Sequence, residues 1–262
     1  MLFLLLSIIS SVTVGVIFKI SRKYSISTTQ IVAWNYTVAL LLCYGFFRPD
    51  FSTIDATAPW GIYIPLGILL PTIFLFLAAS IKHMGIVKTD AAQRLSLFIP
   101  ILAAWLLFDE DFNSLKLIAF IIALPALLLI LSKKTDNYDN KWIYPAIVLV
   151  GFGVIDILFK QIALATGLPF TTSLFVVFGI SLIIILIVAF YEVLFKKVKI
   201  KNNNLLIGAI VGLFNFGNIL FYLKAHQAFA KNPSTVFAAM NMGVILIGSL
   251  VGVLLFKEKL NS

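Results

Sequence analysis

The sequence predicts an all-α, polytopic membrane protein composed of two inverted repeats of five transmembrane helices, with the tenth helix missing from this chain. Three observations lead to this prediction: the composition, a succession of apolar segments, and a motif that occurs twice. Of the 262 residues, 61% are hydrophobic and 12% are charged, and the mean hydropathy is +1.06. Soluble domains are about 45–50% apolar and about 25% charged. Too few charged side chains are present to cover a water-facing surface, so a lipid bilayer is the expected solvent.

Nine apolar segments of helix length follow one another along the chain, separated by charged or turn-forming residues. They cover residues 2–20, 28–47, 60–81, 91–108, 115–131, 142–165, 171–195, 205–225 and 234–256. The first segment has no basic region before it, which favours a retained helix over a signal peptide. The most hydrophilic stretch, 132–141, separates five helices from four. We therefore expect a first repeat at 1–131, a polar linker at 132–141 and a second repeat at 142–262.

The repeated motif is F-x-E-x-x-N-S, which begins at Phe108 and again at Phe256, 148 residues later (256 − 108). At the same spacing Gln93 aligns with Asn241, so polar positions match as well as apolar ones. A unit of five helices has an odd number of crossings. The second repeat must therefore cross the membrane in the opposite direction to the first.

The basic residues predict an orientation. Of the 20 lysines and arginines, 13 fall in loops on one side of the predicted membrane and 4 on the other, while Lys19, Arg94 and Lys160 lie within helices. Cytoplasmic loops are enriched in lysine and arginine. The first, third, fifth and seventh loops are therefore predicted to be inside and the N-terminus outside. The net charge of +9 is assigned to this asymmetry and not to a nucleic-acid partner.

Two LLF-x-E segments, at 106–110 and 254–258, resemble a motif of the EamA-like family of the drug/metabolite transporter superfamily. The segments 78–92 and 222–239 also resemble that family, and the likeness covers essentially the whole chain. The resemblance implies ten helices in two inverted repeats, so a tenth helix of about 20 residues is expected after Ser262. Family members usually place both termini in the cytosol, whereas the lysine count predicts the reverse for this chain.

Asp156 is the first candidate for coupling transport to protons. It lies near the middle of the sixth predicted helix, where an ionisable side chain is costly and usually functional. Its counterpart in the first repeat is Gly15, so the acid breaks the repeat. Lys160, four residues later, is the second candidate. An ion pair between the two would make both structural, and Lys160, like Lys19, could instead extend its amine to the membrane interface.

Arg94 and Gln93 are predicted to bind substrate. Pro100 lacks an N–H and should leave the carbonyl of Ser96 free, which would add an acceptor to the arginine and the amide. A guanidinium in such a place can bind an anionic group such as a carboxylate; the alternative is an anchor among lipid headgroups. The remaining predicted substrate-binding residues are amides and aromatic rings within helices: Asn35, Asn215, Asn218, Asn241, Trp34 and Tyr222. For each asparagine the alternative is a hydrogen bond to a neighbouring helix.

These observations favour a secondary transporter of a small polar metabolite, such as an amino acid, that alternates access between two inverted halves. The resemblance also allows efflux of cationic drugs, but the small multidrug members of the superfamily rely on a carboxylate in their first helix, and residues 1–20 contain no acid here. A non-transporting membrane scaffold is the other alternative. An enzyme is not expected, since His83 and His226 are the only histidines and both are predicted at interfacial helix ends. The expected partners are the bilayer and a small-molecule substrate, a homodimer is compatible with the sequence, and no cofactor, metal or nucleic acid is expected.

Overall fold

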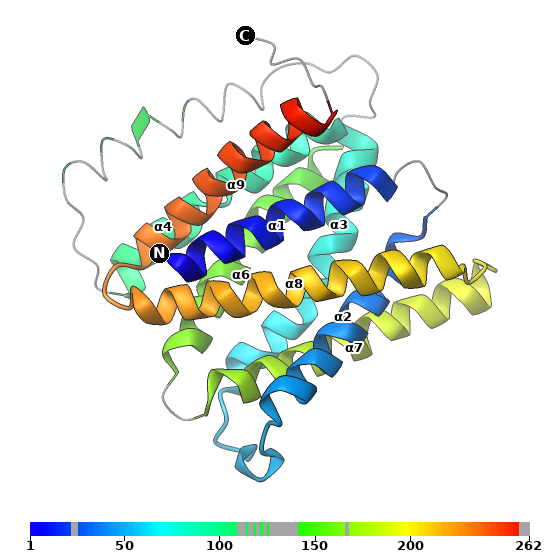
Figure 1. Ribbon diagram of the computed structural model, residues 1–262, viewed down its shortest axis with the longest axis horizontal. Coiled ribbons are helices and arrows are strands. Elements are labelled where there is room, and N and C mark those ends of the chain that lie inside the picture. Colours follow the sequence, from blue (N-terminus) through cyan, green and yellow to red (C-terminus); the bar gives the residue numbers. More distant parts are fainter. Residues whose placement is uncertain are drawn as a thin grey trace.

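The computed structural model is helical throughout the residues that it describes, apart from connecting turns (Figure 1). It describes residues 1–21, 26–108, 141–165 and 168–256, together with 114, 118, 121, 122 and 125. Eight helices in these ranges are long and apolar enough to cross a membrane, which confirms a polytopic, all-helical membrane protein. Most of the predicted helix at 115–131 and of the linker at 132–141 lies outside the described residues, as do Glu110 and Glu258 of the repeated motif.

The first part of the chain forms α1 (Leu2–Ser21), α2 (Thr28–Phe47), the short helix η1 (Phe51–Thr53), α3 (Trp60–Leu95) and α4 (Phe98–Leu107). The Ser27 hydroxyl caps the start of α2 by accepting a hydrogen bond from the backbone N–H of Gln30. Arg48 adopts a left-handed conformation with φ 42° directly after α2 and ends that helix. These bounds agree with the helices predicted at 2–20 and 28–47.

α3 contains two helices that meet at Gly85, whose φ of 80° is readily available only to glycine. The two membrane-crossing segments on either side are Trp60–Gly85 and Lys88–Leu107. The second begins before the predicted 91–108 and includes a turn that separates α3 from α4. In this turn the N–H of Ile99 donates to the carbonyl of Ser96 at 3.1 Å. The prediction that Pro100 leaves this carbonyl free is therefore wrong, because a tighter turn satisfies it.

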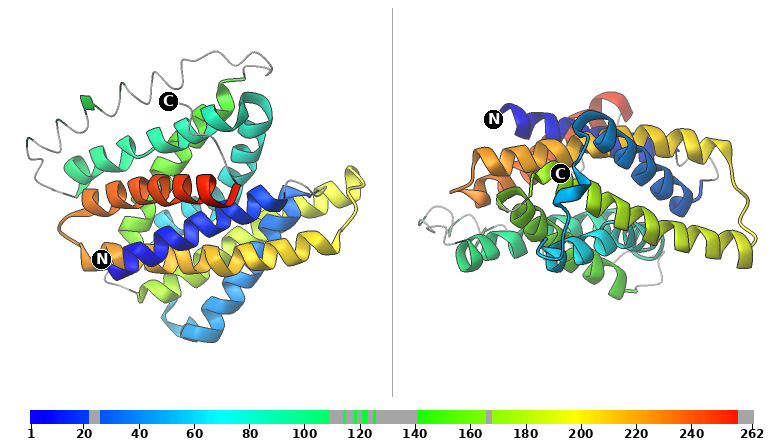
Figure 2. Two further views of the ribbon diagram at one scale, coloured as in Figure 1. Left: turned by 45° about the horizontal axis from the view of Figure 1, so that its top comes forward. Right: turned by 90° about the horizontal axis from the view of Figure 1, so that it is seen from below.

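The second part of the chain forms α6 (Ile143–Leu164), α7 (Phe170–Phe195), α8 (Asn202–Ala228) and α9 (Pro233–Phe256). Figure 2 shows α1 beside α8 and α9, so the two ends of the described chain meet in one layer. Most of the strong helix contacts join the two parts of the chain. The fold is thus one intertwined bundle and not two bundles placed end to end.

The helix packing has the form expected of a repeated unit. α3 packs against α6, and α8 packs against α1; α2 packs against α8, and α7 packs against α3; α1 packs against α9, and α6 packs against α4. When α1, α2, α3 and α4 change places with α6, α7, α8 and α9, in that order, each of these contacts becomes the other member of its pair. α2 with α7 and α4 with α9 are the pairs that such an exchange leaves unchanged.

Glycines bring some of these helices into close contact. Gly208 and Gly212 are four residues apart on the face of α8 that meets α2. A Cβ at Gly212 would lie 2.7 Å from the backbone oxygen of Asn35. Small residues at this spacing allow helix backbones to approach closely in membranes. Gly67 of α3 is similarly placed against Ile180 of α7.

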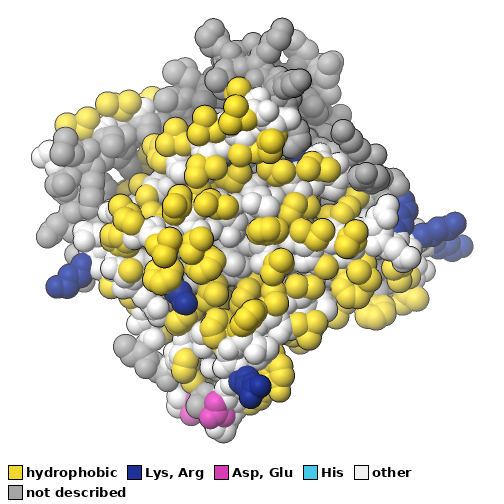
Figure 3. Space-filling view, viewed as in Figure 1, with side chains coloured by type: hydrophobic (Ala, Val, Ile, Leu, Met, Phe, Trp, Pro, Cys, Tyr) yellow, Lys and Arg dark blue, Asp and Glu magenta, His cyan; other side chains and the backbone are white. Residues whose placement is uncertain are grey.

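The surface is largely apolar, as is required of helices that face lipid. Figure 3 shows hydrophobic side chains over much of the visible face, with few basic side chains, most of them near its edges. Large exposed side chains include Trp105, Ile183, Ile187, Leu246 and Leu254. The buried core contains Tyr36, Tyr63 and Phe178 together with aliphatic side chains from both parts of the chain. Polar side chains in this interior therefore need a specific explanation.

Candidate functional site

A hydrogen bond between Asp156 and Tyr222 forms the centre of the candidate site. Asp156 lies in α6 and Tyr222 in α8, and the tyrosine hydroxyl donates to Oδ1 of the acid at 2.9 Å. The tyrosine is buried. Two of the residues predicted for transport are therefore brought into direct contact from different helices. The alternative considered for Asp156, an ion pair with Lys160, is not formed within the described part of the chain, where the acid is bonded to Tyr222.

Glycines fix the position of Asp156 by packing α6 closely against the first part of the chain. Gly151 lies against Ile73 of α3, and a Cβ at Gly153 would come 2.6 Å from the side chain of Ile99. These contacts hold one face of α6, and Asp156 lies one turn further along. Ile155 and Phe159 beside it are buried, so the acid is in an apolar setting in which the hydroxyl of Tyr222 is its hydrogen-bond partner.

His226 extends this polar group along α8. Its ring centroid lies 4.6 Å from that of Tyr222 and 4.8 Å from that of Phe237 in α9. The side chain is 0% exposed, and neither ring nitrogen has a hydrogen-bond partner among the described residues. The prediction of an interfacial histidine is therefore wrong, because α9 covers the end of α8. Its spacing of four residues from Tyr222 was the available signal, since such residues share a helix face.

Lys160 is also buried, with 0% of its surface exposed. Its Nζ donates to the carbonyl of Ala230 in the turn between α8 and α9 at 3.0 Å, and it lies 5.9 Å from the ring centroid of Phe108. The amine thus reaches the turn between two membrane-crossing helices, where it is bonded to protein and not exposed. α6 carries the lysine beneath the turn that follows α8, and the carbonyl there replaces water as a partner.

Two of the predicted amides bond to protein groups. Ser7 of α1 donates its hydroxyl toward Asn218 in α8, with Oγ 2.8 Å from Oδ1 and 3.0 Å from the backbone oxygen. Asn241 donates from Nδ2 to the carbonyl of Phe237 one turn earlier in α9, at 3.2 Å. Asn218 thus makes the helix-to-helix contact that was the alternative to substrate binding. Asn241 and its aligned partner Gln93 are not hydrogen-bonded to one another among the described residues.

Asn35 and Asn215 differ from the other amides because each has an unpaired polar atom. Asn35 in α2 is 1% exposed and Asn215 in α8 is 5% exposed. Within the described residues, Oδ1 of Asn35 and Nδ2 of Asn215 have no hydrogen-bond partner. One atom is an acceptor and the other a donor, and both side chains belong to the closely packed α2–α8 crossing. Trp34 lies at this crossing too, against Gly208.

Arg94 is at the other side of the bundle, in the last turn of α3. Its Nη2 lies 3.2 Å from Oδ1 of Asp90, one turn earlier, and its side chain is 16% exposed. Nε is buried without a partner in the described structure. The carbonyl of Gln93 accepts a hydrogen bond from Ser96 at 2.6 Å. The carbonyl of Ser96, which was expected to be a free acceptor, is already hydrogen-bonded to Ile99. The polar group around Arg94 therefore consists of Arg94, Asp90 and Gln93.

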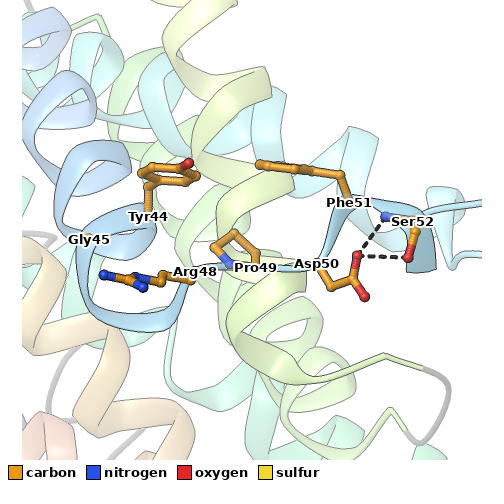
Figure 4. Close-up of a pocket in the computed structure, with 7 residues that line it drawn as sticks. All are labelled: Tyr44, Gly45, Arg48, Pro49, Asp50, Phe51 and Ser52. Carbon is orange, nitrogen blue, oxygen red and sulfur yellow. Dashed lines mark hydrogen bonds between the residues drawn. The ribbon is translucent and has the colours of Figure 1, made fainter.

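A pocket of about 640 Å³ opens at the end of α2 and in the loop after it (Figure 4). Its lining residues are Tyr44, Gly45, Arg48, Pro49, Asp50, Phe51 and Ser52. Asp50 accepts hydrogen bonds from the N–H and hydroxyl of Ser52, which lower the pKa of its carboxyl. None of the residues predicted to bind substrate lines this pocket. Tyr222 is buried and Asp156 is half-buried, and neither residue lines this pocket.

Comparison with known proteins decides which family has these features. The sequence model of the EamA-like transporter family matches residues 1–132, half of the chain. The chain belongs to the EamA-like transporter family. This family is part of the drug/metabolite transporter superfamily, as the LLF-x-E segments predicted.

The EamA-like chain is also similar to a protein of Haemophilus influenzae. The two are 40% identical over 270 residues, which covers 98% of this chain and 90% of the relative. That relative is described as an uncharacterized protein. The family membership and the eight apolar helices together make this chain a multi-pass membrane protein of a transporter family.

Proposed function

We propose that this EamA-like protein is a secondary transporter that moves a small polar metabolite, such as an amino acid or a related compound, across the cell membrane. The observation that carries the proposal is the hydrogen bond between Asp156 and Tyr222 within the helix bundle. Burying a polar or ionisable group in the bilayer region is costly, and such groups mark substrate or proton pathways. Family membership supplies transport as the general activity, and the half-buried Asp156 supplies a group that can couple it to protons.

Proton coupling is proposed to act through Asp156, with Lys160 as a neighbouring charge. A carboxyl group alternates between a form that only accepts hydrogen bonds and a form that also donates one. Tyr222 donates to it in this conformation, so gain of a proton would change the bond that joins α6 to α8. A change in the contact between these two helices is a route from protonation to helix movement.

The unpaired amide atoms of Asn35 and Asn215 are the proposed polar contacts for substrate. A ligand with one donor and one acceptor could satisfy both atoms when α2 and α8 separate. The zwitterionic groups of an amino acid meet this requirement. Trp34 lies beside this crossing, and Arg94 with Gln93 would provide a second polar contact for an anionic group.

The transport cycle is proposed to alternate between two inverted repeats, at 1–131 and 142–262, joined by the linker 132–141. The exchange of helix contacts between the two parts of the chain supports this assignment. The loops that are rich in lysine are proposed to face the cytoplasm, which places the N-terminus outside. A membrane protein of this kind requires no cofactor in the proposed cycle.

The proposal is tested by screening the purified protein for thermal stabilisation by amino acids, sugars, nucleosides and organic cations. A compound that binds the folded state raises its apparent stability. A stabilising polar metabolite is then measured for exchange in proteoliposomes containing the unlabelled compound. Stabilisation by organic cations alone would favour drug efflux instead. A protein that exchanges no stabilising compound would contradict transport and favour a scaffold.

A further inference from the structure

We infer that two hydrogen-bonded pairs, Gln30 with Asn204 and Tyr63 with Ser173, are latches that close the transport path at opposite ends of the bundle. The first is called the α2–α8 latch and the second the α3–α7 latch, after the helices that each pair joins. The inference deepens the proposed function, because a latch has a role only where the two halves of the protein move. It rests on polar contacts separate from the Asp156 site.

The α2–α8 latch is a buried amide pair. Nδ2 of Asn204 donates to Oε1 of Gln30 at 2.7 Å, and Nε2 of Gln30 donates to the carbonyl of Lys199 at 3.0 Å. The backbone N–H of Ser27 donates to Oδ1 of Asn204 at 3.3 Å. Asn204 is 1% exposed and Gln30 is 7% exposed, so these amides bond to protein and not to water. The start of α2 is thereby tied to the start of α8.

The α3–α7 latch is a buried pair of hydroxyls. Oη of Tyr63 and Oγ of Ser173 are 2.6 Å apart, and both residues are 0% exposed. Tyr63 lies in the first turn of α3 and Ser173 in the first turn of α7. This pair also joins the two parts of the chain.

The two latches occupy corresponding places in the repeated packing. Gln30 and Asn204 are each the third residue of their helix, whereas Tyr63 and Ser173 are each the fourth. The exchange that relates the two parts of the chain replaces α2 by α7 and α8 by α3. Under this exchange the residues of one latch correspond to those of the other, with a shift of one residue along each helix, although the side chains differ.

The α2–α8 latch is at the start of α2, and the α3–α7 latch is near the other end of that helix. Gln30 is in its first turn, whereas Cys43 near its last turn lies 3.4 Å from the carbonyl of Thr171, two residues before Ser173. The rise of a helix over this interval is about 20 Å. Figure 1 shows α2 and α7 side by side along this direction. The lysine-rich loop before α8 is at the first end, and the pocket lined by Arg48 and Asp50 is at the other.

Both latches are closed here, since each pair is hydrogen-bonded and buried. Amides and hydroxyls can exchange a protein partner for water when helices separate, so these contacts can open without leaving a buried charge. A pocket of about 310 Å³ already lies outside the α2–α8 latch, lined in part by Ser27, Lys199 and Asn204. Opening one latch at a time would expose the interior to one side of the membrane only.

The test measures access to the interior from each side, without needing the substrate. Asn35 and Val177, the eighth residues of α2 and α7, are 1% and 0% exposed beneath the respective latches. Each is replaced by cysteine in a Cys43→Ala background. Reaction with a small membrane-impermeant thiosulfonate is followed in right-side-out and inside-out vesicles.

Asn204→Ala removes the hydrogen bonds that the side chain makes with Gln30 and with the N–H of Ser27. It should raise the reaction rate of the Asn35→Cys thiol from the lysine-rich side by at least about five-fold, the typical effect of a single hydrogen bond, and lower that of Val177→Cys. Tyr63→Phe should have the opposite effect on the two thiols. Asn203→Ala, beside Asn204 but exposed, and Tyr191→Phe, on the surface of α7, are the matched controls. Asn204→Asp, which keeps the size and loses the donor, replaces the alanine variant if that does not reach the membrane.

Equal rates in latch and control variants would overturn the inference, as would a variant in which both thiols react faster together. The result is separable from that of the proposed function. Exchange is measured in the protein that keeps Asn35, because Asn35 is itself a proposed substrate contact. Opposite changes of the two thiols, together with no exchange of a metabolite, would retain the latches and contradict transport. Exchange in a protein whose thiols do not respond would retain transport and contradict the latches.

Discussion

Tyr222 donates a hydrogen bond to Asp156 across the α6–α8 contact, with 2.9 Å between the two oxygens. The same tyrosine ring packs edge-on against Phe159, at 6.3 Å, and against His226, at 4.6 Å. The hydroxyl and the ring thus have separable roles. The ring contributes to packing, and the hydroxyl supplies a donor to an acid that is surrounded by apolar side chains.

Tyr222→Phe removes this donor and keeps the ring contacts. A hydrogen bond to a charged group is worth about 1.5–3 kcal/mol, so we expect proton-driven uptake to fall about ten-fold or more. The melting temperature in detergent should change little by comparison. Tyr191→Phe, on the exposed surface of α7, is the control. Unchanged uptake in Tyr222→Phe would remove the hydroxyl from the coupling mechanism.

Gly212→Ala tests the close approach of α8 to α2. The added Cβ would lie 2.7 Å from the backbone oxygen of Asn35, which is too close for the helices to stay in place. Overpacking of this kind costs about 1–3 kcal/mol, and we expect a lower melting temperature by scanning fluorimetry. Gly179→Ala is the matched control, since no atom lies within 4 Å of its Cβ. A melting temperature equal to that of Gly179→Ala would contradict the packing described for α2 and α8.

Ser52→Ala tests the acidic loop after α2. Hydrogen bonds from the hydroxyl and N–H of Ser52 lower the pKa of Asp50 below its usual value. A group whose folded-state pKa is lowered stabilises the fold above its unfolded pKa, and this contribution is lost as the pH falls through the folded pKa. The variant should raise the pKa of Asp50, so the contribution is lost at a higher pH. Carboxyl-carbon NMR titration measures the shift.

The neighbouring Asp55 provides the control for that titration. Its carboxyl accepts equivalent hydrogen bonds from the N–H and hydroxyl of Thr57, which lower its pKa. Ser52→Ala should leave the pKa of Asp55 unchanged, and Thr57→Ala should raise it. A Ser52→Ala protein in which both acids shift together would show a rearranged loop and not the loss of a single bond.

Single cysteines test the orientation predicted from the lysines and arginines. Ala56→Cys lies in the exposed loop before α3, and Ile200→Cys in the exposed loop before α8, each in a Cys43→Ala background. In intact cells an impermeant maleimide should label Ala56→Cys and not Ile200→Cys, since lysine-rich loops remain inside. Inside-out vesicles should give the reverse pattern. Labelling of Ile200→Cys in intact cells would place the N-terminus inside and contradict the predicted orientation.

The sequence predicted helices far better than their partners. Segments such as 28–47 and 171–195 end at charges, proline or turn residues, so their bounds agree with α2 and α7 to within a residue or so. Apolar composition does not specify which helix packs against which. The contact of α2 with α8 depends on the shapes of Gly208 and Gly212, which a hydropathy pattern does not encode.

The site shows the same division between local and tertiary information. Asp156 was identifiable because an acid in an apolar helix is conspicuous, but its contact with Tyr222 joins distant segments. The burial of Lys160 and His226 was not predicted because each is near a helix end, where α9 and the turn before it cover them. Asn204 lies just outside the predicted 205–225, so its bond to Gln30 had no local signal.

Asp156→Asn tests the central claim most directly. The amide is nearly the same size as the acid and cannot take up and release a proton. In proteoliposomes, uptake of the substrate driven by a pH gradient should be lost, while exchange of labelled for unlabelled substrate should continue. Asp55→Asn, in the exposed loop before α3, should retain both activities. Uptake by Asp156→Asn with unchanged dependence on pH would contradict proton coupling at this residue.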